Sequence, residues 1–450
     1  MTADPDRPRD RRPGRADAVT LGVELVLIAA AVVVGVVLNQ RGVRLHADTA
    51  PIYASWRPHV GWGTPVAVAV AAAVVGWGPR WARTARWGPL LAVGYLGAVA
   101  WTLSLAMIDG WSAGVAERLT AQAEYLHEVP RITDIAAMVA GFSDRIIDFR
   151  PGSWSTHTAG HPPGALLVFV WLDRLGLGGG AAAGLACILT GASAAVTVPT
   201  ALRWLGAAEA ARTVLPFLVL LPGAVWIGAS GDGVFTGVVA AGLALLAARH
   251  PAALLTGGVL LGFALYLSYG FVLVGPLALA VLALRRGRFL PALLIAGVGV
   301  AAVVVAFTVA GFWWWDGYQL VVERYYQGWA AERPYAYWVW ANLAALLLSA
   351  GLVVGPALRR TVVAAWHAGR REGQAGVARP TIVLPIAAAV SIVAADLSGL
   401  SKAEVERIWL PFVVWLLVAT AHLPAGGRRW WLAGQAATAL AVNHLLFTVS

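Results

Sequence analysis

Apolar runs alternate with short polar segments along the chain, and a run of about 20 apolar residues crosses a bilayer as one helix. Arg clusters and Pro or Gly turns separate the runs. The pattern predicts an all-α, polytopic transmembrane bundle, with residues 1–18 as an Arg-rich tail and residues 19–450 as a single transmembrane domain. We expect about 13 spans, at approximately 19–38, 63–78, 88–108, 180–202, 212–229, 231–249, 252–267, 269–284, 290–311, 337–357, 380–396, 406–423 and 430–448.

The apolar segment 163–171 is shorter than a span and runs into Asp173, Arg174 and a Gly-rich turn. We expect a helix that enters the membrane without crossing it. The Arg-rich segments 285–288 and 359–379 then lie with the N-terminus on the cytoplasmic side, as basic loops do in membrane proteins. Most acidic residues fall on the other side, which predicts a multi-pass plasma-membrane protein with an acidic outer face.

The outer segment 109–162 is too long to be structureless in a compact protein. In its second half the apolar positions follow a helical period, with Thr133 as the expected N-cap: Ile135, Met138, Val139, Phe142 and Ile146. In its first half Val115, Leu119 and Leu126 predict a weaker helix. We expect amphipathic helices at the membrane surface that roof a cavity between the spans.

Composition supports a membrane protein, because 59% of residues are hydrophobic, only 12% are charged and the mean hydropathy is +0.72. So few charges cannot cover the surface of a soluble protein of 450 residues. The net charge of +10 comes from basic residues scattered between apolar runs, which argues against a nucleic-acid partner. Cys187 stands alone in an apolar run, so no intramolecular disulfide forms.

Candidate chemistry collects on the outer side. Asp109 ends the third span, where a carboxylate could act as a base or simply terminate the helix. His157 and His161 precede Pro163 and could bind an anion, ligate a metal, move a proton or lie as polar residues at the interface. Asp232 occupies a tight turn, where carboxylates are often structural.

Aromatic residues crowd the outer segment 312–336. Trp315, Glu323, Tyr325 and Tyr335 combine ring faces with a carboxylate, which is how proteins hold sugars, although much of this segment would also serve as an aromatic belt. We take these four residues as candidates for sugar or acceptor binding.

Lys402 is the only lysine in the chain. It stands at the outer mouth of a span with Glu404, Glu406 and Arg407. Lys402 and Arg407, about one and a half helical turns apart, could hold a phosphate together, with the two glutamates near the sugar. The alternative is a lysine that extends to the interface beside a structural Glu–Arg pair.

The order and common sidedness of these motifs resemble the GT-C superfamily, integral membrane glycosyltransferases that use polyprenyl-phosphate sugars, and its actinobacterial-type branch in particular. The motifs are the outer Asp109, the long outer loop, the return His161-Pro162-Pro163-Gly164, the turn at Asp232 and the run Glu406-Arg407-Ile408-Trp409-Leu410-Pro411. The chain departs from the family in that its long loop follows the third span, which two extra N-terminal spans would explain.

The resemblance implies a GT-C-like fold and an inverting transferase of the mannosyl or arabinofuranosyl kind, with Asp109 as general base and Asp232 as a second catalytic carboxylate. The donor phosphate is expected at Lys402, Arg407, His161 and His157. Some members bind a divalent cation. Asp109, Asp232 and His161 could hold Mg²⁺ or Mn²⁺ here, although nothing in their spacing requires it.

The expected donor is a polyprenyl-phosphate sugar within the membrane lipids, and the acceptor is a glycan, a lipid or a protein. A transporter or lipid-carrier flippase is the alternative, but such proteins carry ionisable residues at mid-membrane. Here the spans are almost free of charge, with Glu24 as an exception. A catalytically inactive scaffold of the same fold stays open.

Overall fold

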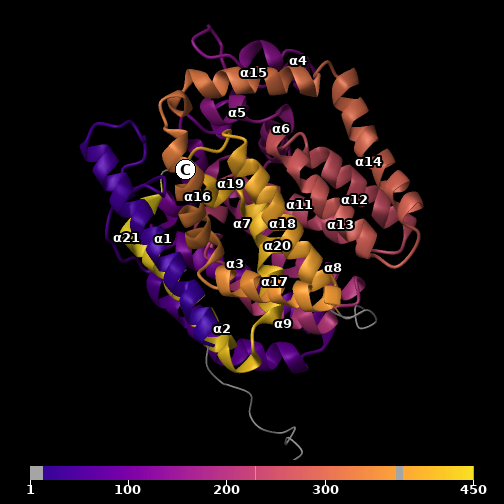
Figure 1. The fold of residues 1–450 in the computed structure, drawn as a ribbon. Helices are drawn as coiled ribbons and strands as arrows, with labels where there is room; N and C mark the ends of the chain where they lie inside the picture. Colours follow the sequence, from indigo (N-terminus) through magenta and orange to yellow (C-terminus); the bar gives the residue numbers. More distant parts are fainter. Residues whose placement is uncertain (1–13, 229, 371–378, 449–450) are drawn as a thin grey trace, which may run out of the picture.

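The computed structural model describes residues 14–228, 230–370 and 379–448, and Figure 1 shows them as a bundle of helices. The helices of ten or more residues are α1 (Arg15–Gln40), α2 (Gly63–Thr84), α3 (Trp87–Ala106), α6 (Pro163–Arg174), α7 (Gly180–Ala192), α8 (Ala194–Trp204), α9 (Ala208–Val219), α11 (Asp232–Leu246), α12 (Pro251–Ala264), α13 (Gly275–Leu284), α14 (Phe289–Val309), α15 (Trp314–Gln327), α16 (Tyr335–Ala350), α17 (Val354–Arg370), α18 (Arg379–Leu397) and α21 (Arg428–Leu445).

Shorter elements connect these helices. They are α4 (Ile135–Ala140), α5 (Thr156–Gly160), α10 (Ala224–Ile227), α19 (Val405–Ile408) and α20 (Leu410–Leu416), with the π turn η1 (Ser112–Ala116) and the 3₁₀ turns η2 (Arg118–Thr120), η3 (Tyr125–His127), η4 (Val129–Arg131), η5 (Ser143–Arg145), η6 (Tyr269–Val274), η7 (Trp329–Ala331), η8 (Leu417–His422) and η9 (Ala425–Gly427). Strands β1 (Ala54–Trp56) and β2 (Leu446–Thr448) pair antiparallel, with Ser55 opposite Phe447.

Several helices are long and apolar enough to cross a membrane, which confirms the all-α class and the membrane prediction in this coarse form. In the described residues these are α1, α3, the joined α7–α8, α14 and α18, 5 in all, or up to 7 if each of two bent pairs is one span. The bent pairs are α16 with α17, at 98°, and residues 410–422 with 425–445, at 119°. The number of 13 crossings stays a prediction.

Contacts at and near the helix ends define two ends of the bundle. At one end Tyr53 contacts Glu406, His59 contacts His444, and Arg324 contacts Asp148. At the other end Arg359 and Arg360 bind Asp17, and Arg429 binds the backbone of Gly76. We call the first end the loop end and the second the arginine end.

The segment 109–162, which we call the roof of the loop end, differs in part from its prediction. Met138, Val139, Phe142 and Ile146 are buried, which confirms the apolar face. The N-cap is Asp134, whose carboxylate accepts from two backbone N–H groups at 2.8 and 3.1 Å, so the assignment to Thr133 is wrong. The weaker helix expected in the first half is also wrong, because that stretch forms π and 3₁₀ turns.

Three helices bear on the predicted connections. α6 is 12 residues long, or about 18 Å, which is shorter than the hydrocarbon core that a crossing helix must span. α15 lies across the loop end, where the sequence predicted an aromatic loop (Figure 1). α17 continues as a helix into the segment 359–379, which was expected to be a connection, and residues 371–378 of that segment, like residues 1–13, lie outside the described chain.

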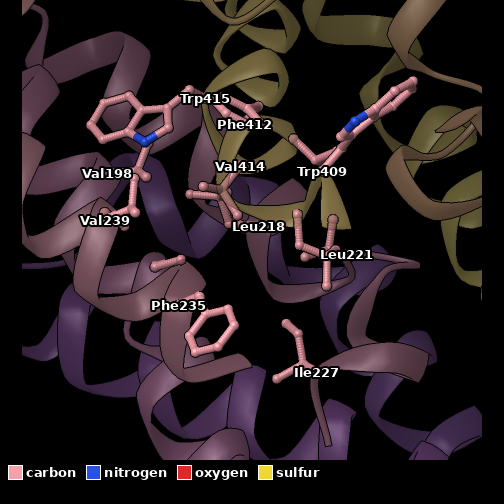
Figure 2. Packing of buried hydrophobic residues seen from close by; sticks show 14 of the residues in the cluster. Val198, Leu218, Leu221, Ile227, Phe235, Val239, Trp409, Phe412, Val414 and Trp415 are labelled. Atoms are coloured by element: carbon pink, nitrogen blue, oxygen red, sulfur yellow. The ribbon is translucent and has the colours of Figure 1, made fainter. Parts of the chain in front are cut away.

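A core of large apolar side chains holds the C-terminal motif beside α11. Figure 2 shows Trp409, Phe412 and Trp415 packed with Phe235 and Leu218. Trp409 and Trp415 are almost fully buried. This packing fixes α19 and α20 against the start of α11, so that Arg407 and Asp232 are brought together from positions 175 residues apart.

Candidate functional site

The Lys402–Arg407 segment is not a continuous helix. Ala403 and Glu404 both have left-handed backbone, with φ of 73° and 63°, which is uncommon for residues other than glycine. α19 begins only at Val405. Because the chain reverses here, the helical spacing expected between Lys402 and Arg407 is wrong, while the Glu404 side chain is turned toward Arg407. Two strained residues in succession are typical of functional segments.

Arg407 is the centre of the site. Its guanidinium is 6% exposed and donates to Asp232 Oδ2 at 2.9 Å and to Glu404 Oε2 at 2.5 Å. Asp232 is buried in the first turn of α11, where the helix N-terminus also favours a negative charge. Burial opposes the charge on Glu404, but Arg407 and Arg333 together lower the pKa of that carboxyl to about 2. The cation therefore holds the carboxyl groups of Asp232 and Glu404 in fixed positions.

His157 joins this group from the roof. Its Nε2 lies 3.5 Å from the Arg407 guanidinium, and its Nδ1 lies 2.7 Å from Glu124 Oε1. Since arginine only donates, Nε2 is the acceptor and Nδ1–H donates to the carboxylate. Glu124 is buried, and its second oxygen has no partner in the described residues. This carboxylate–imidazole pair has the arrangement that orients a histidine for proton transfer.

His161 lies beside the same group as a neutral side chain. Its Nδ1 is 2.8 Å from the carbonyl oxygen of His157 and 2.9 Å from the Tyr125 hydroxyl. The carbonyl can only accept, so the proton is on Nδ1. Burial lowers the pKa of His161 to about 4, although Asp232 acts in the opposite direction. Burial, together with the charges of Asp232 and Glu124, raises the pKa of the Tyr125 hydroxyl well above its usual range. His161 and Tyr125 therefore both make their hydrogen bonds as neutral side chains.

Arg333 ties three outer segments together. Its guanidinium donates to the carbonyl oxygens of Leu45, His46 and Lys402, and it lies 3.3 Å from Glu404. Arg333 therefore holds the loop after α1 and the segment after α15 against the left-handed turn at Ala403 and Glu404, beside Arg407.

The Lys402 side chain contacts different residues from the Arg407 side chain. Its Nζ donates to the Ala330 carbonyl at 2.9 Å and lies 5.3 Å from the centre of the Tyr326 ring. Its backbone N–H donates to the Tyr325 hydroxyl. Partial burial, reinforced by Arg333, lowers the pKa of Lys402. No contact in the described residues links the Lys402 ammonium to Arg407, so the structure does not bring them together as a two-cation phosphate site.

Glu406 is buried on the other side of α19. Its Oε1 accepts from the Tyr53 backbone N–H at 3.0 Å, and its Oε2 has no partner in the described residues. Burial raises the pKa of Glu406 to about 7. The sequence predicted Glu404 and Glu406 as equivalent ligands of the sugar or acceptor. Glu404, with a pKa of about 2, is ionised at neutral pH, whereas Glu406, with a pKa of about 7, is only partly ionised there.

Asp109 lies in a separate group at the same end of the bundle. Its Oδ1 is 2.7 Å from His59 Nε2, and its Oδ2 accepts from Arg118 at 3.1 Å. Arg118 also donates to the Thr448 carbonyl and lies over the Phe447 ring. Asp109 thus orients Arg118, which holds the C-terminal strand β2 against η2, and in the described residues Asp109 shares no partner with Asp232.

The predicted aromatic ligands divide into two groups. Tyr325 belongs to the strained turn through Lys402, and burial raises the pKa of its hydroxyl to about 12. Tyr335 donates to the Leu397 carbonyl at 3.4 Å. Trp315 and Glu323 lie on exposed parts of α15, and no contact joins them to Arg407 in the described residues.

The predicted metal ligands do not form one set. Asp109, Asp232 and His161 are divided between the two groups, and the described residues contain no cluster of three or more His, Cys, Asp or Glu side chains placed to hold a metal ion. Asp232 already has a cationic partner in Arg407. We therefore derive no step through a metal.

Sequence reasoning missed several members of the site. Glu124 and Tyr125 stand in a stretch with weak helical pattern, and Tyr53 and Arg333 come from segments that are distant in sequence. One feature of the sequence could have indicated the pair Glu124–His157, namely that both residues belong to the same predicted outer loop. His59 and Arg118 became relevant only once the fold placed them on Asp109.

The fold and the site together define a helical membrane protein with a cluster of charged side chains buried at one end. Comparison with known protein families, curated proteins and solved structures finds no significant match to this chain.

Proposed function

We propose that this protein is an integral membrane glycosyltransferase that moves a sugar from a polyprenyl-phosphate donor to an acceptor hydroxyl on the extracytoplasmic face. One observation carries the proposal: Arg407, Asp232, Glu404 and the pair His157–Glu124 meet, buried or partly buried, at one end of a bundle of apolar helices. Clustered titratable groups that are shielded from solvent and oriented by one another are typical of an active site. A lipid-linked donor reaches such a position from the bilayer.

Lys402 is better suited than Arg407 to contact the donor phosphate. Its ammonium has a carbonyl partner and, in the part of the chain that the structure describes, no carboxylate partner, so it keeps donors for an anion. Arg407 is occupied by two carboxylates and is almost fully buried. We assign it to positioning Asp232 and Glu404, which would then accept hydrogen bonds from sugar hydroxyls.

The acceptor oxygen would attack the anomeric carbon as the bond from that carbon to the phosphate oxygen breaks. The electron pair leaves with polyprenyl phosphate, whose charge the Lys402 ammonium stabilises. The proton of the acceptor hydroxyl passes to a base. Two groups compete for this role: Asp109, from the family resemblance, and His157, which Glu124 orients beside Arg407. Attack from the face opposite to the phosphate inverts the configuration.

The test is transfer by the purified protein from radiolabelled polyprenyl-phosphate sugars to a panel of glycan, lipid and peptide acceptors, with and without EDTA. His157→Gln and Asp109→Asn are compared at equal amounts of folded protein. The base is the residue whose variant loses transfer while it still binds donor. If the folded wild-type protein neither binds nor uses any donor, the proposal fails and a transporter of such lipids becomes the better account.

A further inference from the structure

Three arginines line one hollow at the arginine end. Arg83 of α2, Arg212 of α9 and Arg428 of α21 line this small hollow together. α2 starts next to Met107, close to Asp109, and its 22 residues extend about 33 Å to this end. The hollow therefore lies roughly one hydrocarbon thickness from the candidate active site.

Within the described residues no carboxylate neutralises the positive charge of this hollow. In the described residues none of the three arginines forms an ion pair with a carboxylate. Arg212 donates to the carbonyls of Ala82 and Ala85, and Arg428 Nε donates to the carbonyl of Leu423, so these bonds orient both guanidiniums. Arg83 and Arg428 line the same hollow, so like charges lie near each other here.

The walls of the hollow and its surroundings indicate the kind of ligand. Pro79, Pro216 and Phe217 supply apolar walls below the arginines. Trp77 and Trp430 stand close in sequence to the lining residues and are 69% and 70% exposed. Exposed tryptophans mark the headgroup level of a bilayer. The arginines thus lie where a lipid phosphate lies, with apolar surface toward the acyl chains.

We propose that Arg83, Arg212 and Arg428 form a binding site for a phosphate group, and that its source is the headgroup of an anionic phospholipid. Guanidiniums donate two parallel hydrogen bonds to phosphate oxygens, and a phosphate placed here relieves the repulsion between Arg83 and Arg428. The site is independent of the proposed glycosyl transfer.

The experiment measures lipid binding to the full-length protein in detergent by native mass spectrometry, with phosphatidylglycerol against phosphatidylcholine. Arg83→Gln/Arg428→Gln removes two charges and leaves Arg212, which caps α2. The matched control is Arg80→Gln/Arg86→Gln, which removes two charges on the same end outside the hollow. Arg83→Lys/Arg428→Lys keeps the charge but loses the paired donors.

We expect the wild-type protein and the control to prefer phosphatidylglycerol, and the Arg83→Gln/Arg428→Gln variant to bind it about 10- to 30-fold more weakly. The lysine variant should lie between them. A parallel titration with inorganic phosphate separates the sources: phosphate binding that needs the same arginines, without lipid preference, would overturn the lipid assignment and leave a soluble anion. Equal binding of both ligands by all variants would overturn the site itself. Circular dichroism and gel filtration confirm that each variant is folded.

Discussion

The pair Asp232–Arg407 should couple strongly, because both side chains are almost fully buried and joined at 2.9 Å. At an effective dielectric constant of about 20, two charges about 4 Å apart attract by about 4 kcal/mol. Arg407→Gln leaves Asp232 as a buried carboxylate without its cation, while Glu404 keeps Arg333, and breaking a buried pair in this way costs about 3–5 kcal/mol. Asp232→Asn should cost less, because Arg407 keeps Glu404.

The assay is unfolding in mixed detergent–SDS micelles at pH 7, applied to both single variants and the double variant. We expect the double variant to lose less stability than the sum of the two, with a coupling energy of about 1–3 kcal/mol. Asp173→Asn is the control, since Asp173 and Arg174 form an exposed pair at 3.9 Å that should contribute about 0–1 kcal/mol. Additive effects at Asp232 and Arg407, no larger than the control, would refute the buried pair.

Three further predictions concern single side chains. Glu406 has a folded-state pKa of about 7 against 4.5 for the free side chain, so its contribution to stability is greatest below pH 4.5 and declines by about 3 kcal/mol as the pH rises to 7. Glu406→Gln should remove this decline. Identical pH profiles of unfolding for the variant and the wild type would contradict the prediction. Asp109→Asn leaves the buried Arg118 without its carboxylate and should destabilise the protein by about 3 kcal/mol, whereas a variant of full stability that loses transfer would make Asp109 the base rather than an anchor. Lys402→Met should raise KM for the donor by roughly 10- to 100-fold with Lys402→Arg in between, and an unchanged KM would remove Lys402 from the phosphate site.

The sequence predicts the helices well because an apolar run of span length has few alternatives in a membrane. α1, α3, α14 and α18 lie close to the predicted spans 19–38, 88–108, 290–311 and 380–396. The apolar period of residues 135–146 also identifies the buried face of the roof. α15 was missed because its many aromatic residues fit a surface belt as well as an amphipathic helix.

The site is less predictable because its contacts are long-range and its backbone is unusual. Arg333 bonds to Leu45 and His46 across almost 290 positions, and no local pattern announces such a contact. The left-handed Ala403 and Glu404 are ordinary residues in the sequence, so a regular helix was the natural expectation for Lys402 to Arg407. Asp109 and Asp232 lie at the same end of the bundle, but their different partners appear only in the folded chain.

Glycosyl transfer is tested most directly by measuring both of its products. Purified protein is incubated with labelled polyprenyl-phosphate sugars and the acceptor panel, and the glycosylated acceptor and the released polyprenyl phosphate are quantified together. We predict equal amounts of the two products, of inverted anomeric configuration, formed by the wild-type protein and lost in the variant of the catalytic base. Folded wild-type protein that releases neither product from any donor would contradict the account.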